Sequence, residues 1–333
     1  MRSFHYERAQ DIDAAVQSAA DANASYLAGG TTLLDLMKLD VLRPSTVVDI
    51  GSLEDHFGSI EVNRSGLKLG ALVRMADAAE HPEIRRDYPM IAQSLEKAAS
   101  TQLRHMATLG GNVLQRTRCA YFRDPDTSAC NKRVPGSGCA ALEGLNRTHA
   151  VLGTSSQCIA TYPGDFAQAL IALDASVMVA GPEGPRSLSF EDLHVPPGET
   201  PHIETVLQPG ELITSFSIEA APWTRRSIFL KVRDRESFAF ALASAAIALD
   251  MDSAGGKVQA ARIALGGVAT RPWRSHEAEA LLVGKPFSRE QAEMAAEAAF
   301  SGADPRPDNA YKIELGRRCL TAALCRAAAM ELS

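Results

Sequence analysis

The sequence predicts an α+β fold in three successive parts, because its helical and strand patterns change character twice along the chain. Residues 1–57 alternate helical and strand patterns, as in "DIDAAVQSAADA", "ASYLAGG" and "TVVDIG". Residues 58–220 turn to antiparallel strands, beginning with "SIEVNRSGLKLGALV". Residues 221–333 place the strands "SIFLKVR", "SAAIALDMD" and "VQAARIALGGV" before alanine-rich helices. The stretch "AAPWTRR" at 220–226 is typical of a linker between the second and third parts.

Composition and charge narrow the class of protein. The chain has 333 residues, of which 46% are hydrophobic, and this is enough for more than one core. Its 34 basic and 40 acidic residues give a net charge of −6, without a basic stripe for nucleic acid or a membrane surface. No apolar stretch resembles a signal peptide or approaches the roughly 18 residues of a membrane span. We therefore expect a globular protein without a signal peptide of its own, whose partners are proteins and small molecules.

Two glycine-rich turns indicate where a ligand binds. The stretches "AGGTT" at 28–32 and "TLGGN" at 108–112 match neither G-x-G-x-x-G nor a P-loop, so each is alternatively an ordinary structural turn. Glycines before a helix let a ligand approach the backbone, whose free N–H groups favour an anion such as phosphate. Two such turns in one chain indicate a dinucleotide shared between them. Asp165 in "PGDF" suits either a sugar hydroxyl of that ligand or the N-cap of the next helix.

Four of the six cysteines gather in one irregular stretch, at about residues 116–160, which we call the cysteine segment. Their spacing, C-x10-C-x8-C-x18-C, fits neither paired zinc ligands nor a bacterial ferredoxin. Four thiolates can bind a tetrahedral zinc ion or a [4Fe–4S] cluster, and four free thiols are the third alternative. Nearby cations would offset the charge of a thiolate-ligated centre; they are Arg116, Arg118, Arg123, Lys132, Arg133 and Arg147.

These stretches together resemble the FAD-binding medium subunit of the molybdenum hydroxylases, in the xanthine dehydrogenase family, and within it the flavoproteins of periplasmic aldehyde oxidoreductases. The resemblance rests on "LAGGTTLLDLMK", "RHMATLGGNVLQRTRC", "CNKRVPGSGCAALEGLNRTHAVLG" and "YPGDFAQALIALDA", and it covers essentially the whole chain. It implies a two-part FAD-binding domain of the PCMH / CO dehydrogenase flavoprotein type, at 1–57 and 58–220. A CO dehydrogenase flavoprotein-like C-terminal domain of one sheet and helices would follow at 221–333.

The resemblance also implies cofactor ligands. Most flavin domains of the family lack the cysteine segment, but in the resembling subfamily it carries a [4Fe–4S] cluster, here with the ligands Cys119, Cys130, Cys139 and Cys158. The first FAD loop comprises Leu27, Ala28, Gly29, Gly30, Thr31, Thr32, Leu33 and Leu34, whose N–H groups would bind the pyrophosphate. The second comprises Ala107, Thr108, Gly111, Asn112 and Leu114.

Three further positions match family residues at FAD. Asp165 would contact the dinucleotide, and Ile213 and Lys231 would lie beside the isoalloxazine ring. A lysine there would favour the anionic reduced flavin, although Lys231 is alternatively a solvated charge at the end of a strand. We expect no residue of this chain to act as a catalytic acid or base on the substrate.

The resemblance implies an electron-transfer subunit of a heterotrimeric molybdenum-dependent aldehyde oxidoreductase. A large molybdopterin-binding subunit would oxidise the aldehyde, and a small [2Fe–2S] subunit would pass the electrons singly to FAD, which can release two together. One alternative is the flavin subunit of a xanthine dehydrogenase-type enzyme that reduces NAD, and another is a non-redox binding protein with structural zinc. Export together with a partner that carries a twin-arginine signal would place the chain in the periplasm; otherwise it is cytoplasmic.

Overall fold

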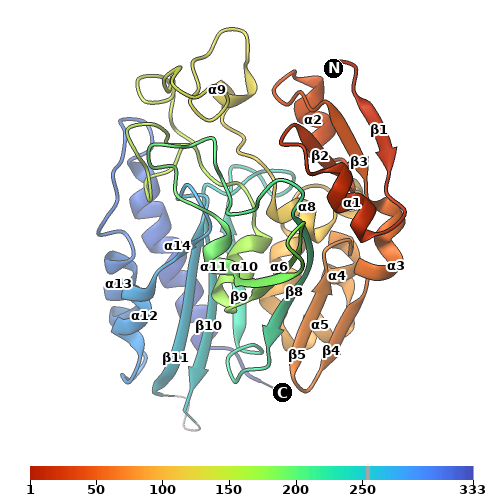
Figure 1. Cartoon of the computed structure of the whole chain (residues 1–333). Coiled ribbons are helices and arrows are strands. Elements are labelled where there is room, and N and C mark those ends of the chain that lie inside the picture. Colours follow the sequence, from red (N-terminus) through yellow and green to blue (C-terminus); the bar gives the residue numbers. More distant parts are fainter. Residues whose placement is uncertain (253–255, 333) are drawn as a thin grey trace.

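The computed structural model describes residues 1–252 and 256–332, in which three sheets follow one another along the chain (Figure 1). The first sheet is parallel, with the order β1-β3-β2. Its strands are β1 (His5–Arg8), β2 (Ala24–Leu27) and β3 (Thr46–Asp49). The helices α1 (Ile12–Ser18) and α2 (Leu33–Lys38) connect these strands, as parallel pairing requires, and α3 (Glu54–Phe57) follows them.

The second sheet is antiparallel, with the order β4-β5-β8-β6-β7. Its strands are β4 (Ile60–Asn63), β5 (Gly66–Gly70), β6 (Ser176–Ala180), β7 (Arg186–Ser189) and β8 (Leu212–Glu219). The antiparallel strands predicted from "SIEVNRSGLKLGALV" are confirmed as β4 and β5, which a turn after Asn63 connects. Most of the connecting helices precede β6: α4 (Met75–Glu80), α5 (Pro82–Asp87), α6 (Pro89–Glu96), α7 (Thr101–Met106), α8 (Leu109–Val113), α9 (Ala120–Arg123) and α10 (Phe166–Ala172). One more, α11 (Phe190–Leu193), follows β7.

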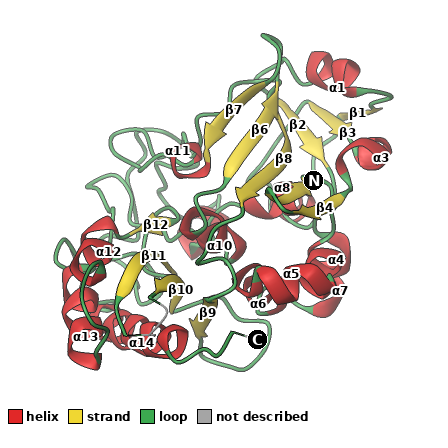
Figure 2. Cartoon of the chain, turned by 90° about the horizontal axis from the view of Figure 1, so that it is seen from below, coloured by secondary structure: helices red, strands yellow, loops and turns green. Residues whose placement is uncertain are grey.

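The third sheet confirms the predicted strands of the last part of the chain. It is antiparallel with the order β12-β11-β10-β9, formed by β9 (Ser227–Val232), β10 (Ala243–Met251), β11 (Val258–Gly266) and β12 (Trp273–Arg274). Three helices follow: α12 (His276–Leu282), α13 (Arg289–Ala298) and α14 (Tyr311–Ala328). Figure 2 shows these three on one side of the sheet and α5 and α6 on the other.

Both faces of the third sheet are covered, which explains why β10 is almost continuously apolar. Alternate residues of a strand face opposite sides. Ala246 and Ala248 belong to the core shared with the second sheet, whereas Ile247 and Leu249 belong to the core under the C-terminal helices. The third sheet is therefore the layer that joins the second sheet and its helices to the C-terminal helices.

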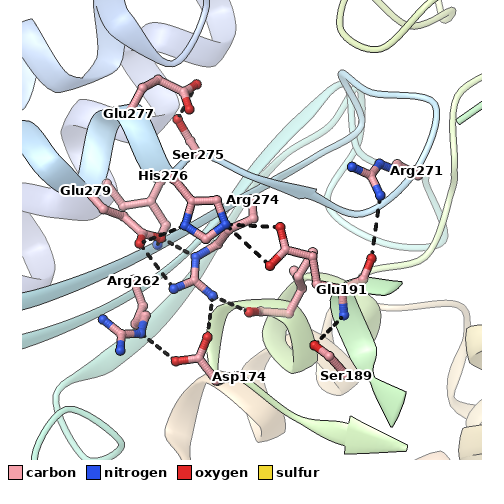
Figure 3. Close-up of polar contacts among 12 residues, drawn as sticks. Asp174, Ser189, Glu191, Arg262, Arg271, Arg274, Ser275, His276, Glu277 and Glu279 are labelled. Atoms are coloured by element: carbon pink, nitrogen blue, oxygen red, sulfur yellow. Dashed lines mark hydrogen bonds and ion pairs between the residues drawn. The ribbon is translucent and has the colours of Figure 1, made fainter. Parts of the chain in front are cut away.

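Ion pairs connect the second part of the chain to the third sheet across this junction (Figure 3). Arg274 of β12 and Arg262 of β11 donate to Asp174, which follows α10, at 2.8 Å and 2.6 Å. The Asp174 carboxylate is half exposed. Arg274, only 8% exposed, also donates to the buried carboxylate of Glu279, and that pair lies within the C-terminal part.

The cysteine segment contacts the C-terminal part as well as the two parts before it, and its stretch "HAVLG" forms no strand of the described fold. Val151 and Leu152 belong to the core under the C-terminal helices. Lys312 of α14, fully buried, donates to the carbonyls of Thr148 at 2.9 Å and Gly267 at 2.6 Å. The predicted boundaries at 57/58 and 220/221 stay a proposal, and contacts of this segment cross the second of them.

Candidate functional site

The two glycine loops meet edge to edge. The first leads from β2 into α2, and the second leads from α7 into α8. A Cβ atom on Gly29 would lie 1.9 Å from the carbonyl oxygen of Met106, so the first loop packs backbone to backbone against the second. Gly30 has φ +71°, a conformation that glycine adopts without strain. These two glycines therefore fix how the loops meet.

Beside this junction lies a first cavity of about 270 Å³. The first loop lines it from Ala28 to Leu33, and Thr108, Gly111 and Leu114 of the second loop face it. Ile213 of β8 closes one side. Leu27 and Leu34 belong to the lining of neither cavity at the loops, but their side chains lie against Gly30 and support its turn.

A second and larger cavity, of about 630 Å³, lies on the other side of the loop junction. Ala107, Asn112, Asp165 and Lys231 line it. Thr31 and Thr32 line both cavities, so the start of α2 is the wall that they share. The structure thus places Ile213 and Lys231 in different cavities, although the resemblance assigned both to the same ring.

Asp165 and Lys231 form a buried ion pair at the wall of the second cavity. The Lys231 Nζ donates to Asp165 Oδ2 at 2.6 Å and to the carbonyl of Lys97 at 3.0 Å. Their side chains are 4% and 1% exposed, so Lys231 is not a solvated charge at the end of a strand. Asp165 occupies the N-cap position of α10, but its side chain makes no capping hydrogen bond. Burial raises the pKa of Asp165, and the charge of Lys231 opposes that rise.

Two buried oxygen atoms at the second cavity have no hydrogen-bond donor within the described part of the chain. One is Asp165 Oδ1 and the other is Asn112 Oδ1, whose amide nitrogen contacts the sulfur of Met75 at 3.4 Å. A buried acceptor without a donor is costly, and natural proteins rarely leave one. The second cavity therefore suits a ligand that presents hydroxyl or N–H groups to these two oxygens.

Sequence reasoning missed the outer part of this cavity. Asp35 of α2 accepts from Arg123 at 2.8 Å and from Arg118 at 3.2 Å, and all three side chains line the cavity. The hydrogen bond from Arg123 is the largest influence that lowers the pKa of Asp35. Phe238 and Phe240 also line it while 55% and 49% exposed. Their only signal in the sequence was a pair of aromatic residues in a polar loop.

The four cysteines of the cysteine segment gather around one region. Cys130 and Cys139 pair through their backbones, and Cys119 packs in one small core with Cys130. Burial raises the pKa of Cys119 to about 12, and the nearby Cys130 and Cys158 thiolates add to the rise. Burial likewise raises the pKa of Cys158 to about 11, with contributions from Cys139 and Cys130. Each thiol thus lies within electrostatic reach of at least one other.

This arrangement is looser than a site for a single metal ion. Within the described residues, no three His, Cys, Asp or Glu side chains converge closely enough to hold one ion. A zinc ion requires thiolates about 2.3 Å from one centre, whereas the four thiolates of a [4Fe–4S] cluster bind four different irons and stand further apart. A histidine that sequence reasoning missed lies here too, because His149 Nε2 is 3.2 Å from the sulfur of Cys119.

Comparison with known families matches almost the whole chain. Residues 2–220 match the FAD binding domain in molybdopterin dehydrogenase, and residues 228–329 match the CO dehydrogenase flavoprotein C-terminal domain. The chain is 46% identical over 332 residues to the aldehyde oxidoreductase FAD-binding subunit PaoB of Escherichia coli, with 99% of each chain covered. It is 24% identical over 307 residues to the glyceraldehyde dehydrogenase medium chain of Sulfolobus acidocaldarius, covering 92% of this chain and 90% of that one.

Solved structures share the fold. Reconstituted CO dehydrogenase from Oligotropha carboxidovorans superposes with a TM-score of 0.77 at 23% identity, over 99% of each chain. Quinoline 2-oxidoreductase from Pseudomonas putida 86 superposes with a TM-score of 0.74 at 25% identity, over 98% of this chain and 97% of that one. None of the helices in the described part of the chain has the length and apolar character to cross a membrane.

Proposed function

The chain belongs to the FAD-binding subunits of the molybdenum hydroxylases, and from this premise we propose how it binds FAD and what it does with it. Thr31 and Thr32, which precede α2 at the wall that the two cavities share, and backbone N–H groups of both glycine loops would hold the pyrophosphate. Residues of the first cavity would hold the adenosine half, and Ala107, Asn112, Asp165 and Lys231 of the second would hold the flavin half.

Two observations support this orientation, the unpartnered oxygens Asp165 Oδ1 and Asn112 Oδ1 and the buried charge of Lys231. The ribityl hydroxyls and the isoalloxazine N–H would donate to the oxygens; because adenosine also carries hydroxyl and amino donors, the charge of Lys231 is what favours the flavin half in this cavity. Lys231 holds Asp165 in place through a 2.6 Å hydrogen bond and supplies a buried positive charge beside the ring. That charge favours the reduced, anionic flavin and raises its reduction potential.

The flavin subunit is the electron outlet of a heterotrimeric, molybdenum-dependent aldehyde oxidoreductase. FAD supplies the chemistry of accepting electrons one at a time and releasing two. Electrons arrive from the [2Fe–2S] clusters of a small partner subunit, and the aldehyde is oxidised on a large molybdopterin-binding subunit. The support for an aldehyde substrate is the 46% identity to the E. coli aldehyde oxidoreductase subunit over nearly all of both chains. The complex lies in the periplasm if a partner carries a twin-arginine signal.

We propose further that the cysteine segment binds a [4Fe–4S] cluster through Cys119, Cys130, Cys139 and Cys158. Its support is the mutual electrostatic influence of these thiols and the neighbouring cations, of which Lys132 lowers the pKa of Cys158. A cluster would also fasten a long segment that has only one short helix, α9, of its own.

The first experiment is a cofactor count on the purified chain. We expect about one FAD and about four iron atoms per chain, with flavin bands in the visible spectrum and a broad iron–sulfur absorption beneath them. Zinc in place of iron, with a flavin spectrum alone, would remove the cluster and leave the flavin proposal standing. A colourless protein that contains zinc would favour the non-redox alternative and refute both proposals.

The second experiment tests the electron route in the complex co-expressed with its partner subunits. Aldehyde is mixed anaerobically with the complex, and flavin bleaching is followed by stopped flow. We expect aldehyde to reduce the flavin, and NAD to leave the reduced flavin unchanged. Rapid reoxidation by NAD would favour the xanthine dehydrogenase-type alternative, and a flavin that aldehyde does not reduce would refute the aldehyde proposal.

A further inference from the structure

A third cavity, of about 280 Å³, adjoins the first cavity, with which it shares Leu114 and Arg116, and its lining combines polar, charged and apolar side chains. It is bounded by the segment after α8, by the cysteine segment, and by the loops that follow α11 and β11. Arg116, Lys132, Glu204 and Arg271 supply its charged groups, and His194 lines it as well. Cys158 and Lys132 of the cysteine segment also line it, whereas Arg271 and His194 belong neither to the first two cavities nor to the cysteine segment, so these two side chains call for a separate explanation.

The cavity carries an excess of positive charge. Glu204 is its only carboxylate among the residues that line it, and both of its oxygens are engaged, Oε1 by Lys132 Nζ at 2.9 Å and Oε2 by Arg116. Arg271 has no carboxylate partner in residues 1–252 and 256–332. Its Nη1 donates to the carbonyls of His194 at 3.1 Å and Glu191 at 3.5 Å (Figure 3), and its buried Nε has no acceptor there. One carboxylate thus faces three cations.

His194 adds a buried acceptor to this lining. The residue is only 6% exposed, and its Nε2 lies 3.2 Å from the carbonyl oxygen of Val113. A carbonyl can only accept, so Nε2 must carry the proton. Burial lowers the pKa of His194 to about 4, so the ring is neutral near pH 7 and Nδ1 is a bare acceptor. This Nδ1 is buried without a donor in the described part of the chain.

We propose that this cavity binds a small oxyanion that still carries a proton. Arg271 and Lys132 attract the negative charge, and the unused Nε–H of Arg271 supplies a hydrogen bond to it. His194 Nδ1 accepts the O–H of the ligand, a contact that a fully deprotonated oxyanion cannot make. The ligand class is therefore a protonated oxyanion such as hydrogen phosphate, or a small carboxylate that bears a hydroxyl group.

Inorganic phosphate and sulfate are a matched pair of probes. They have nearly the same size and shape, but at about pH 6.5 phosphate retains at least one proton and sulfate retains none. Titration calorimetry is done on the FAD-loaded subunit at constant ionic strength, so that the flavin pyrophosphate loops are already occupied. We expect phosphate to bind at one site and sulfate to bind at least about tenfold more weakly. Sulfate has no proton to donate to His194 Nδ1, so that buried hydrogen bond is lost and the nitrogen lone pair faces the negatively charged ligand.

Substitutions of Arg271 test whether phosphate binds in this cavity. Arg271→Gln should weaken phosphate binding by about tenfold to a hundredfold, since it removes a charge-assisted hydrogen bond. Arg271→Lys keeps the charge and should retain part of the affinity, which covers the case in which Arg271→Gln folds poorly. Arg289→Gln, on the exposed face of α13, is the control and should bind phosphate as the unmodified chain does.

Three outcomes would overturn the proposal. The first is that neither anion binds to the FAD-loaded chain. The second is equal affinity for phosphate and sulfate, which would show that His194 Nδ1 does not select a proton. The third is unchanged phosphate affinity in Arg271→Gln, which would place the anion elsewhere. A chain that contains no FAD would contradict the proposed function but would leave the Arg271 comparison as a valid test of this cavity.

Discussion

Replacing Lys231 by methionine should destabilise the folded chain by about 3–5 kcal/mol near neutral pH, which is the usual cost of removing one partner of a buried ion pair. The figure applies here because both side chains are almost fully buried, at 1% exposure for Lys231 and 4% for Asp165. Methionine has nearly the length and apolar stem of lysine, so the loss of stability measures the effect of removing the charge. In the variant, both carboxylate oxygens of Asp165 would be buried without a hydrogen-bond donor from the described residues.

The loss should depend on pH with a definite sign. Burial already raises the pKa of Asp165 while Lys231 opposes the rise, so removing Lys231 raises the folded-state value further. The unfolded carboxyl titrates near about 3.9. A group whose pKa is raised by folding binds its proton more tightly when folded, so the penalty is small at low pH and grows as the pH rises to the folded pKa. We expect a larger loss at about pH 8 than at about pH 5.

Urea unfolding followed by circular dichroism at both pH values measures this loss, with FAD content determined on the same samples. Lys68→Met is the control, because Lys68 pairs with Glu61 at the surface at 3.7 Å and should change stability by about 0.5 kcal/mol or less. Adding Asp165→Asn to Lys231→Met should restore part of the loss. A loss below about 1 kcal/mol that is equal at both pH values would refute the buried-pair reasoning.

Four other substitutions test the loop junction, the cysteine segment and the buried pair of Arg274 with Glu279. Gly29→Ala should deplete FAD and lower stability, because its new Cβ would lie 1.9 Å from the main-chain carbonyl oxygen of Met106. In Gly111→Ala the new Cβ would lie 3.1 Å from the Thr108 hydroxyl, so this variant should retain more FAD. Equal loss of FAD in both variants would contradict this distinction. Cys130→Ser should lose iron and retain most FAD, and aldehyde should still reduce the flavin of the assembled variant; a collapse of that rate with FAD bound would make the cluster an obligatory step. Arg274→Met should cost about 3–5 kcal/mol in urea unfolding by removing the cation that neutralises the buried carboxylate of Glu279, and a loss below about 1 kcal/mol would mean that water reaches this carboxylate.

Regular elements were predictable where the apolar pattern had one clear period. The strands β9, β10 and β11 and the helices after them follow directly from such patterns, as does the turn between β4 and β5. The stretch "HAVLG" has the same apolar character but forms no strand of the described fold. Its Leu152 makes one isolated bridge to Ala269, and its apolar side chains fill the core under the C-terminal helices. Pattern alone cannot distinguish a strand from a loop whose apolar residues are buried by a distant part of the chain.

The polar side of the site depended on partners far away in the sequence. Asp165 precedes a helix, which is the local signature of an N-cap, but its carboxylate binds Lys231 on β9 of another sheet. The local sequence shows which residues can form a hydrogen bond, but it does not show which distant residue is the partner. The cysteine segment shows the same limit, because Lys312 and Asn309 hold its carbonyls from the opposite end of the chain.

Gly29 has a structural role that the glycine pattern did not indicate. The glycine pattern assigned it to the close approach of a cofactor, whereas the structure shows that it permits the close approach of the second loop, at Met106. These two roles are linked in the geometry. Because the loops touch at Gly29, Thr31 and Thr32 lie where the two cavities meet, and a dinucleotide can span both with its pyrophosphate at the junction. A side chain at Gly29 would therefore affect FAD by separating the two halves of its site, even without touching the cofactor.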